Sequence, residues 1–335
     1  MTDSSHEKPP LLDVKDLSVD YGLKGVSSRA LDHVSFALRA GEAVGLVGES
    51  GSGKTTTAMA IAGLLSPNAR VSEGEVRYRG SRLPIDDDAA MRPHRWSETS
   101  VVFQGAMNAL NPVHRIIKQI AEPCMLKLGM SRGEATARGK ELLELVGIPA
   151  DRGAAYPHEL SGGMRQRVMI AMALACRPSI VIGDEPTTAL DVITQAQILK
   201  LLGELRSRLG LALILITHDL SVVAECCDRV MIMYAGRIVE DGTVAEIFAR
   251  PKHPYTRLLI DSIPNPESGK KMIRPIPGDP PNLVNRPLGC AFHPRCPSAL
   301  GICTTKVPSL DKLGRGRVAC HLHRSSQEDK VAAHA

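Results

Sequence analysis

One eight-residue segment constrains the fold of this chain more than any other: Gly48-Glu49-Ser50-Gly51-Ser52-Gly53-Lys54-Thr55. It fits the pattern G-x-x-x-x-G-K-[ST], follows the apolar run 43–47 and precedes residues 56–65, whose composition suits a helix. Between a strand and a helix, such a loop binds polyphosphate through its backbone N–H groups and the helix N-terminus. The segment therefore predicts a nucleotide site in which Lys54 contacts the β- and γ-phosphates and Thr55 coordinates Mg²⁺. The alternatives are a chance glycine loop or a phosphate site with another role.

Composition sets the class of protein around that site. With 335 residues the chain can hold one large domain and a smaller one. Aromatic residues make up only 3% and the net charge is a modest +5, so we expect no nucleic-acid partner. The N-terminus does not resemble a secretory signal, and no apolar run is long enough to span a bilayer. We therefore expect a cytosolic protein whose membrane role, if any, comes through a partner.

Charged residues follow two apolar runs that predict buried parallel strands. Asp184 and Glu185 follow residues 179–183, and His218 follows residues 211–217. Open α/β sheets place their chemistry at the carboxyl ends of their strands. We expect Asp184 to hold the hydration shell of Mg²⁺, Glu185 to orient or deprotonate water, and His218 to contact the γ-phosphate. The alternatives are an exposed acidic pair and a structural histidine.

A predicted helical insertion, residues 105–160, interrupts the α/β pattern. It is followed by Leu160-Ser161-Gly162-Gly163-Met164, where Ser161 fits as the N-cap of the next helix. A serine hydroxyl beside two glycine N–H groups at a helix start predicts a second anion-binding surface.

The N-terminal part predicts two half-buried strands, residues 11–21 and 30–38, with a loop at 22–28 between them. Tyr21 closes the first strand. Its ring either packs within the sheet or faces a purine base, and the sequence leaves both possibilities open.

The last quarter of the chain changes in composition. Prolines accumulate after residue 264, and four of the eight cysteines follow them: Cys290, Cys296, Cys303 and Cys320. In a reducing compartment, ligation is favoured over disulfides. The spacing C-x₅-C-x₆-C-x₁₆-C lacks the close pairs of zinc sites, whereas iron–sulfur clusters tolerate wider spacings. Zinc and four reduced cysteines are the alternatives.

Taken together, these segments resemble the ATP-binding subunits of ABC transporters. The resemblance covers about residues 11–250 and is carried, in the family's order, by the loop 48–55, Gln104, the run Leu160 to Arg167, Asp184-Glu185-Pro186-Thr187, Ala189-Leu190-Asp191 and His218. It implies an α/β fold, the P-loop NTPase ABC cassette: a RecA-like core with an antiparallel β subdomain and a helical subdomain, plus a small cysteine-containing C-terminal extension. It also implies a head-to-tail dimer, in which ATP lies between the phosphate loop of one cassette and the Ser161 segment of the other.

The resemblance also implies roles for individual residues. ATP would be bound by Tyr21, Gly48, Ser50, Gly51, Ser52, Gly53, Lys54, Thr55, Thr56, Ser161, Gly162, Gly163 and Asp191. Glu185 would be the catalytic carboxylate, His218 the γ-phosphate switch, and Gln104 the link from the γ-phosphate to the transmembrane subunit. Mg²⁺ would be held by Thr55, Gln104 and Asp184. The sequence departs from the family pattern at Gly183, at Gly105-Ala106-Met107 and in a long predicted loop after Tyr21; only the assignment of Tyr21 is weakened.

The C-terminal quarter is similar to that of dipeptide, oligopeptide and nickel importer ATPases. The shared segments are His253-Pro254-Tyr255-Thr256, Ile276-Pro277-Gly278, Pro280-Pro281-Asn282, Gly289-Cys290 and Phe292-His293-Pro294-Arg295-Cys296. This similarity implies an ATP-hydrolysing, energy-coupling subunit of a bacterial importer, with dipeptides or oligopeptides as the expected solutes. Some members of that subfamily carry a [4Fe–4S] cluster at cysteines placed as in this chain.

The implied partners are a second, non-identical ATPase subunit, two transmembrane permease subunits at the cytoplasmic face of the membrane and, indirectly, an extracytoplasmic solute-binding protein. Importers of nickel, opines or oligosaccharides are alternatives, as is a soluble or redox-regulated ATPase. The expected organisation is a disordered start (1–10), a cassette (11–264), the extension (265–325) and a flexible end (326–335). We expect the extension to be stapled by its cysteines and to take no part in hydrolysis.

Overall fold

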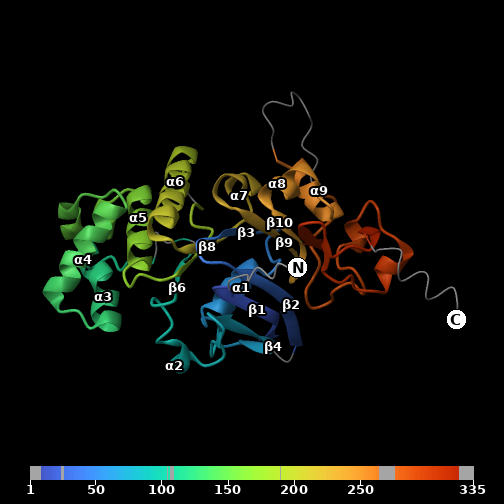
Figure 1. The fold of residues 1–335 in the computed structure, drawn as a ribbon, viewed down its shortest axis with the longest axis horizontal. Coiled ribbons are helices and arrows are strands. Elements are labelled where there is room, and N and C mark those ends of the chain that lie inside the picture. The colour runs from blue at the N-terminus through green and yellow to red at the C-terminus, as the bar shows by residue number, and fades with distance from the viewer. Residues whose placement is uncertain are drawn as a thin grey trace, which may run out of the picture.

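Two β-sheets and a helical arm form the architecture of the protein (Figure 1). The computed structural model describes residues 9–23, 26–103, 105, 109–188, 190–263 and 276–323. In Figure 1 the helical arm lies at one end of the molecule and the C-terminal residues at the other, with the larger sheet between them.

The smaller sheet is antiparallel, with strand order β2-β1-β4-β5. Its strands are β1 (Leu12–Leu23), β2 (Val26–Leu38), β4 (Ala69–Tyr78) and β5 (Ser81–Arg82). The loop predicted at residues 22–28 is wrong at both of its ends, because Gly22 pairs with Ser27 and Leu23 with Val26. The glycine- and serine-rich sequence has little strand propensity of its own, but pairing with neighbouring strands outweighs that preference.

The larger sheet has eight strands in the order β11-β12-β10-β9-β3-β8-β7-β6. They are β3 (Ala43–Val47), β6 (Thr99–Val102), β7 (Ile180–Asp184), β8 (Ala212–Thr217), β9 (Arg229–Tyr234), β10 (Arg237–Thr243), β11 (Asp311–Leu313) and β12 (Gly316–Val318). Strands β6, β7, β8, β3 and β9 are parallel. The residues of β3, β7 and β8 are all buried, as the continuous apolar runs predicted.

Helices surround this sheet and build the arm. The arm contains α3 (Ile116–Leu128), α4 (Arg132–Leu145) and α5 (Gly162–Ala173), which share one hydrophobic core with α6 (Val192–Leu209). The other helices are α1 (Lys54–Ile61), α2 (Asp88–Met91), α7 (Leu220–Cys226), α8 (Val244–Ala249) and α9 (Pro254–Asp261). The sequence pattern predicted neither α7 nor the four-residue helix α2.

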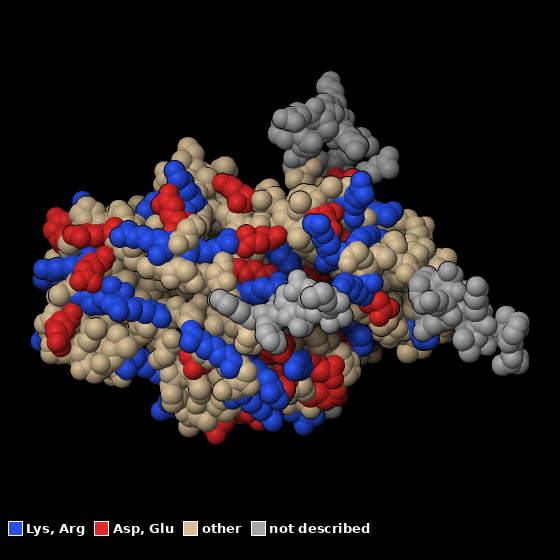
Figure 2. Space-filling model, in the orientation of Figure 1, with Lys and Arg blue, Asp and Glu red and all other residues tan. Residues whose placement is uncertain are grey.

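The surface carries mixed charges, and the helices are short or polar. On the face shown in Figure 2, Lys and Arg side chains alternate with Asp and Glu rather than forming a stripe of one sign. Within the described residues, every helix is too short or too polar to cross a bilayer.

Residues 276–323, hereafter the extension, pack directly on the cassette. This segment contains β11, β12 and three 3₁₀ turns: η5 (His293–Arg295) and η6 (Gly301–Thr304) precede β11, and η7 (His321–His323) follows β12. β12 pairs with β10, so the extension continues the larger sheet. The rings of Tyr234, Tyr255 and Phe292 also form a buried cluster, with centroids 4.7 to 5.3 Å apart. Phe292 belongs to the extension, whereas Tyr234 and Tyr255 belong to the cassette. The cluster therefore buries apolar surface between the two parts of the molecule.

Candidate active site

The phosphate loop joins β3 to α1, in the strand–loop–helix setting that its sequence predicted. A Cβ atom on Gly48 would lie 2.2 Å from the carbonyl oxygen of Met233, so only glycine fits where the loop leaves β3. The Lys54 ammonium donates hydrogen bonds to the carbonyl oxygens of Gly48 (2.8 Å) and Glu49 (2.9 Å). Burial lowers the pKa of Lys54, while the carboxylates of Glu185, Asp184 and Glu49 oppose that shift. The loop thus presents a fixed cation beside a run of backbone N–H groups.

A cleft of about 560 Å³ opens over this loop. Its volume lies in the range of sites that bind small molecules and cofactors. Its walls are Tyr21, Ser28, Ala30, Ser50, Gly51, Gly53, Lys54, Thr55, Thr56, Glu185, His218 and Leu283. Of the predicted nucleotide residues, Gly48 and Ser52 lie in the loop behind this wall, and Ser52 is buried.

The tip of β7 contacts the start of α1. The hydroxyl of Thr55 donates a hydrogen bond to Oδ1 of Asp184 at 3.1 Å. Asp184 is only 2% exposed, and burial, together with the neighbouring charge of Glu185, raises its pKa. Hydroxyl and carboxylate oxygens are hard donors of the kind that Mg²⁺ prefers, so this pair fits a divalent cation. Such a cation would also offset the cost of the buried carboxylate.

Glu185 has an unusual backbone conformation. Its φ of 46° lies in the left-handed region, which costs a residue with a Cβ on the order of 1 kcal/mol or more. Its N–H donates to the carbonyl of Ile216 on β8 at 2.9 Å, which ties it to the neighbouring strand. Its carboxylate accepts from the Thr188 hydroxyl at 2.9 Å and lies 3.2 Å from Nδ1 of His218. The geometry holds a carboxylate and an imidazole together in the wall of the cleft, and a carboxylate there can accept a proton from a water molecule.

A second group of predicted residues lies at two helix starts. Ser161 caps α5 by accepting a hydrogen bond from the N–H of Met164 (3.3 Å), as the sequence predicted. Asp191 caps α6 and accepts from both the N–H and the hydroxyl of Thr194. A Cβ on Gly163 would lie 2.6 Å from the methyl group of Thr194, so the two helix starts are in contact. Among the described residues, none of this group lines the cleft over the phosphate loop.

Comparison with known proteins decides the family. Residues 31–188 match a family model described as "ABC transporter", and residues 239–303 match one described as "Oligopeptide/dipeptide transporter, C-terminal region". A probable peptide ABC transporter ATP-binding protein of Sinorhizobium fredii is 49% identical over 314 residues, covering 92% of this chain and 93% of the relative. The dipeptide transport ATP-binding protein of Haemophilus influenzae is 45% identical, over 96% of this chain and 98% of its own.

The chain belongs to the ATP-binding subunits of ABC transporters. As a member of this family of ATPases, it binds and hydrolyses ATP. A solved structure of the ATP-binding cassette MJ0796, described as a dimer in a post-hydrolysis state bound to ADP and phosphate, aligns with a TM-score of 0.62 and 30% identity. It covers 70% of this chain and 98% of that one.

Tyr21 and Gln104 were predicted to contact the nucleotide. Tyr21 does not end its strand, since β1 continues to Leu23, but its ring both packs on the core and lines the cleft. Gln104 lies outside the described residues.

Four neighbours of the site were not predicted from the sequence: Thr188, Ser28, Ala30 and Leu283. Leu283 comes from the proline-rich extension, where no sequence pattern indicates a ligand contact.

The four cysteines of the extension lie near one another in the structure. Cys290 is electrostatically coupled to Cys296, Cys303 and Cys320, and its N–H donates to the carbonyl of Cys303 at 2.8 Å. Burial raises the pKa of the Cys290 thiol to about 11. Within the described part of the chain, no three of their sulfur atoms converge within 4.8 Å of one another. Sulfurs bound to one zinc ion would lie about 3.8 Å apart, so the four thiols do not form a preorganised zinc site.

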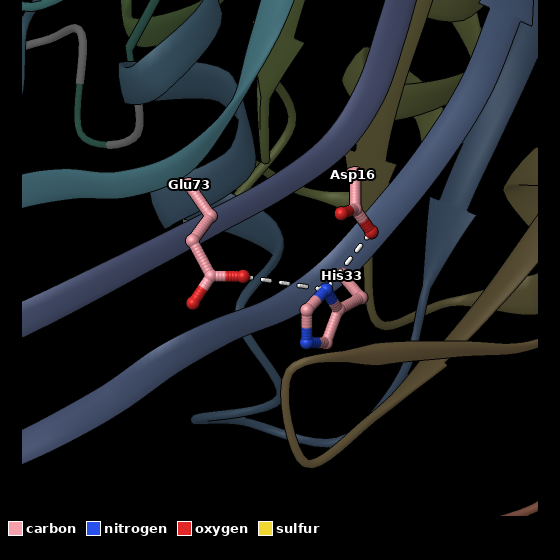
Figure 3. Close-up of side chains that lie close together, drawn as sticks. All are labelled: Asp16, His33 and Glu73. Carbon is pink, nitrogen blue, oxygen red and sulfur yellow. Dashed lines mark hydrogen bonds and ion pairs between the residues drawn. The ribbon is translucent and has the colours of Figure 1, made fainter.

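A cluster on the small sheet contains the ligand types of a metal site. His33 lies between Asp16 and Glu73, with its Nδ1 2.9 Å from one carboxylate and 3.7 Å from the other (Figure 3). All three side chains are exposed, and Arg29 already pairs with Glu73 at 3.2 Å. We interpret the cluster as a surface network of ion pairs, separate from the nucleotide cleft.

Proposed function

We propose that this ABC cassette is the energy-coupling subunit of a bacterial importer of dipeptides or oligopeptides. The names of its relatives, several of which are peptide transport proteins, support the substrate class. The observation that carries the mechanism is the cleft itself, where the phosphate loop, Thr55 and Glu185 line one space and the buried Asp184 accepts a hydrogen bond from Thr55.

In this proposal each residue has one role. Lys54 and the loop N–H groups hold the β- and γ-phosphates, and Tyr21 contacts the adenine ring. Thr55 and Asp184, with Gln104, hold Mg²⁺, which neutralises charge on the phosphates. Glu185 takes a proton from the attacking water, and His218, at 3.2 Å from Glu185, contacts the γ-phosphate.

The separation of Ser161 and Asp191 from the cleft supports a two-cassette arrangement. We assign Ser161, Gly162 and Gly163 to the γ-phosphate of the opposite subunit, with Asp191 at the contact between subunits. Two bound ATP molecules would then close the dimer, and hydrolysis would reopen it and move the permeases at the cytoplasmic face of the membrane. The partner cassette is a related, non-identical chain, so the isolated subunit should hydrolyse ATP slowly.

The experiment is to purify the subunit together with its permeases, the second cassette and the solute-binding protein. In vesicles, ATP hydrolysis should rise when the binding protein is loaded with a dipeptide or an oligopeptide. Stimulation by nickel or an oligosaccharide, and not by peptides, would reject the substrate class. Full permease-independent activity of the subunit at high dilution would reject the two-cassette mechanism.

For the extension, the proposed cofactor is a [4Fe–4S] cluster held by Cys290, Cys296, Cys303 and Cys320. The proposal rests on the spacing C-x₅-C-x₆-C-x₁₆-C, which is wider than that of zinc sites, and Cys290 is close enough to the other three thiols to interact with them electrostatically. Its role would be to staple a segment with few apolar residues. Protein purified without oxygen should be brown and contain about four irons and four sulfides per chain. A colourless protein with a folded extension would exclude the cluster, and stoichiometric zinc would replace it.

A further inference from the structure

The extension contacts the phosphate loop at one residue, Glu49. The Arg295 guanidinium forms two parallel hydrogen bonds with the Glu49 carboxylate, Nη1 to Oε2 at 2.7 Å and Nη2 to Oε1 at 2.9 Å. The Arg295 side chain is only 6% exposed and that of Glu49 23%. A bidentate ion pair of this kind fixes orientation as well as distance.

Arg295 is itself held in place from two sides. Its Nε donates to the carbonyl of Pro277 at 2.8 Å, and Nη1 also donates to the hydroxyl of Tyr234 at 3.2 Å. The guanidinium carbon lies 5.8 Å from the centre of the Tyr234 ring. The guanidinium therefore reaches Glu49 from a rigid support rather than from a mobile surface side chain.

The backbone of Glu49 is fixed as firmly as its side chain. Its N–H donates to the hydroxyl of Tyr255 at 2.9 Å, and its carbonyl accepts from the Lys54 ammonium at 2.9 Å. Glu49 thus connects Arg295 of the extension to Lys54 of the phosphate loop.

The charge of Glu49 makes this contact consequential. The loop binds an anion, yet it carries a carboxylate close enough to Lys54 to attract that ammonium electrostatically. An unpaired carboxylate there would repel polyphosphate and compete for Lys54. Pairing with Arg295 neutralises Glu49 and leaves Lys54 available to the nucleotide.

We propose that Arg295 is a positioning residue of the nucleotide site, which holds the phosphate loop in its binding conformation and neutralises Glu49 without touching ATP. The extension then contributes twice to ATP binding, through Arg295 behind the loop and through Leu283 in the cleft wall. This proposal rests on the proposed assignment of the cleft as the nucleotide site.

The test measures the Kd for ATP of the full-length chain by calorimetric titration. Arg295→Met should weaken ATP binding on the order of tenfold, because it leaves Glu49 unpaired beside the phosphates. Glu49→Gln in the same chain should restore most of the lost affinity, since it removes the repelling charge. Arg295→Lys keeps the cation but loses the bidentate geometry, so its affinity should lie between those of wild type and Arg295→Met.

The matched control is Arg317→Met. Arg317 also joins the extension to the cassette by a two-bond pair, to Asp241 at 3.0 and 2.6 Å, but that pair lies on β12 and β10 and makes no contact with the loop. Its ATP affinity should be unchanged. If the two Met variants weaken binding equally, or if Glu49→Gln fails to rescue Arg295→Met, charge neutralisation at the loop is rejected.

Two further measurements keep the result interpretable. Lys54→Ala tests the site itself: normal ATP binding by that variant would reject the cleft, whereas its loss together with wild-type binding by Arg295→Met would reject only the role of Arg295. Should Arg295→Met fail to fold, Arg295→Lys decides, since wild-type affinity in that variant contradicts a need for the bidentate contact.

Discussion

The nucleotide cleft and the extension are held together by different means. The phosphate loop and the carboxylates of Asp184 and Glu185 lie at the ends of buried strands β3 and β7, so hydrophobic burial in a regular sheet positions them. The extension has only two three-residue strands and short 3₁₀ turns. Besides the short β12–β10 pairing, it is fixed to the cassette by ion pairs and one aromatic cluster: Arg286 with Asp32, Arg295 with Glu49, Arg317 with Asp241, and the rings of Tyr234, Tyr255 and Phe292.

The difference shows how a segment without a core of its own can still be ordered. Each of these three arginines meets a carboxylate of the cassette, and two of those carboxylates are already paired within it, Asp32 with Arg237 and Asp241 with Arg229. In those two pairs it is mainly the arginine that loses freedom on docking. Perturbing the cleft should therefore change chemistry at constant fold, and perturbing the extension away from Arg295 should change stability first.

The largest effect is expected in the cleft. Glu185→Gln removes the base that lies 3.2 Å from His218, so ATP turnover should fall on the order of 1000-fold while ATP binding persists. Turnover by the purified complex and Kd for ATP are the two measurements. Glu204→Gln, on an exposed position of α6, is the control and should behave as wild type. Turnover near wild type in Glu185→Gln would remove Glu185 from the mechanism.

In the extension the largest effect should be on stability. Phe292 is 1% exposed and packs against Tyr234 and Tyr255, so Phe292→Ala should cost about 3 kcal/mol. Hydrogen exchange should show the loss within residues 276–323 before it reaches β3. Phe103→Ala, at a 38% exposed position, should change stability by less than about 0.5 kcal/mol. Uniform loss of protection over both regions would contradict the distinction between them.

The junction of the two regions should be sensitive to acid. His253 caps α9 through Nδ1, and burial lowers its pKa from 6.5 to about 3, with the charge of His323 adding to the shift. Between those two values the unfolded chain binds a proton that the folded chain excludes. The free energy of unfolding should therefore fall as pH drops from 7 to 4, on the order of 3 kcal/mol from this group alone. His253→Asn keeps a capping oxygen without titrating, and an equally steep pH profile in that variant would contradict the assignment.

The smallest effect is expected from loss of a single hydroxyl group in the cleft or in the extension. The Thr188 hydroxyl donates to Glu185 at 2.9 Å, so Thr188→Val should lower turnover about fivefold with little change in KM. Thr304→Val, which removes a similar hydroxyl bonded to the carbonyl of Gly301 in the extension, should leave turnover unchanged. Equal kinetic effects of the two substitutions would mean that the Thr188 contact has no special role.

The sequence predicted the parts of the molecule whose signals are local. Continuous apolar runs predicted β3, β7 and β8, and Ser161 was predicted as a helix cap. The phosphate-loop pattern and the polar residues at two strand ends placed Lys54 and Glu185 in one site, as the cleft shows. In each case a few neighbouring residues determine the local structure.

What the sequence could not predict depends on distant pairing. Glu49 and Arg295 are 246 residues apart, and neither residue type nor spacing indicates that they meet. The hairpin at residues 22–28 exists because β1 and β2 pair, and β12 exists because β10 offers it an edge. Helix α7 is only seven residues long, too short for its periodicity to be distinguished from a loop.

The pairing of β12 with β10 has a consequence for association between molecules. Without the extension, β10 would be the last strand of the larger sheet, and its free N–H and carbonyl groups could pair with a strand of another chain. The outermost strand is instead β11, which is three residues long and carries exposed Asp311 and Lys312. A short, charged outer strand discourages such pairing. A cassette truncated after residue 263 should therefore self-associate and precipitate, whereas the full-length chain should stay monodisperse under the same conditions.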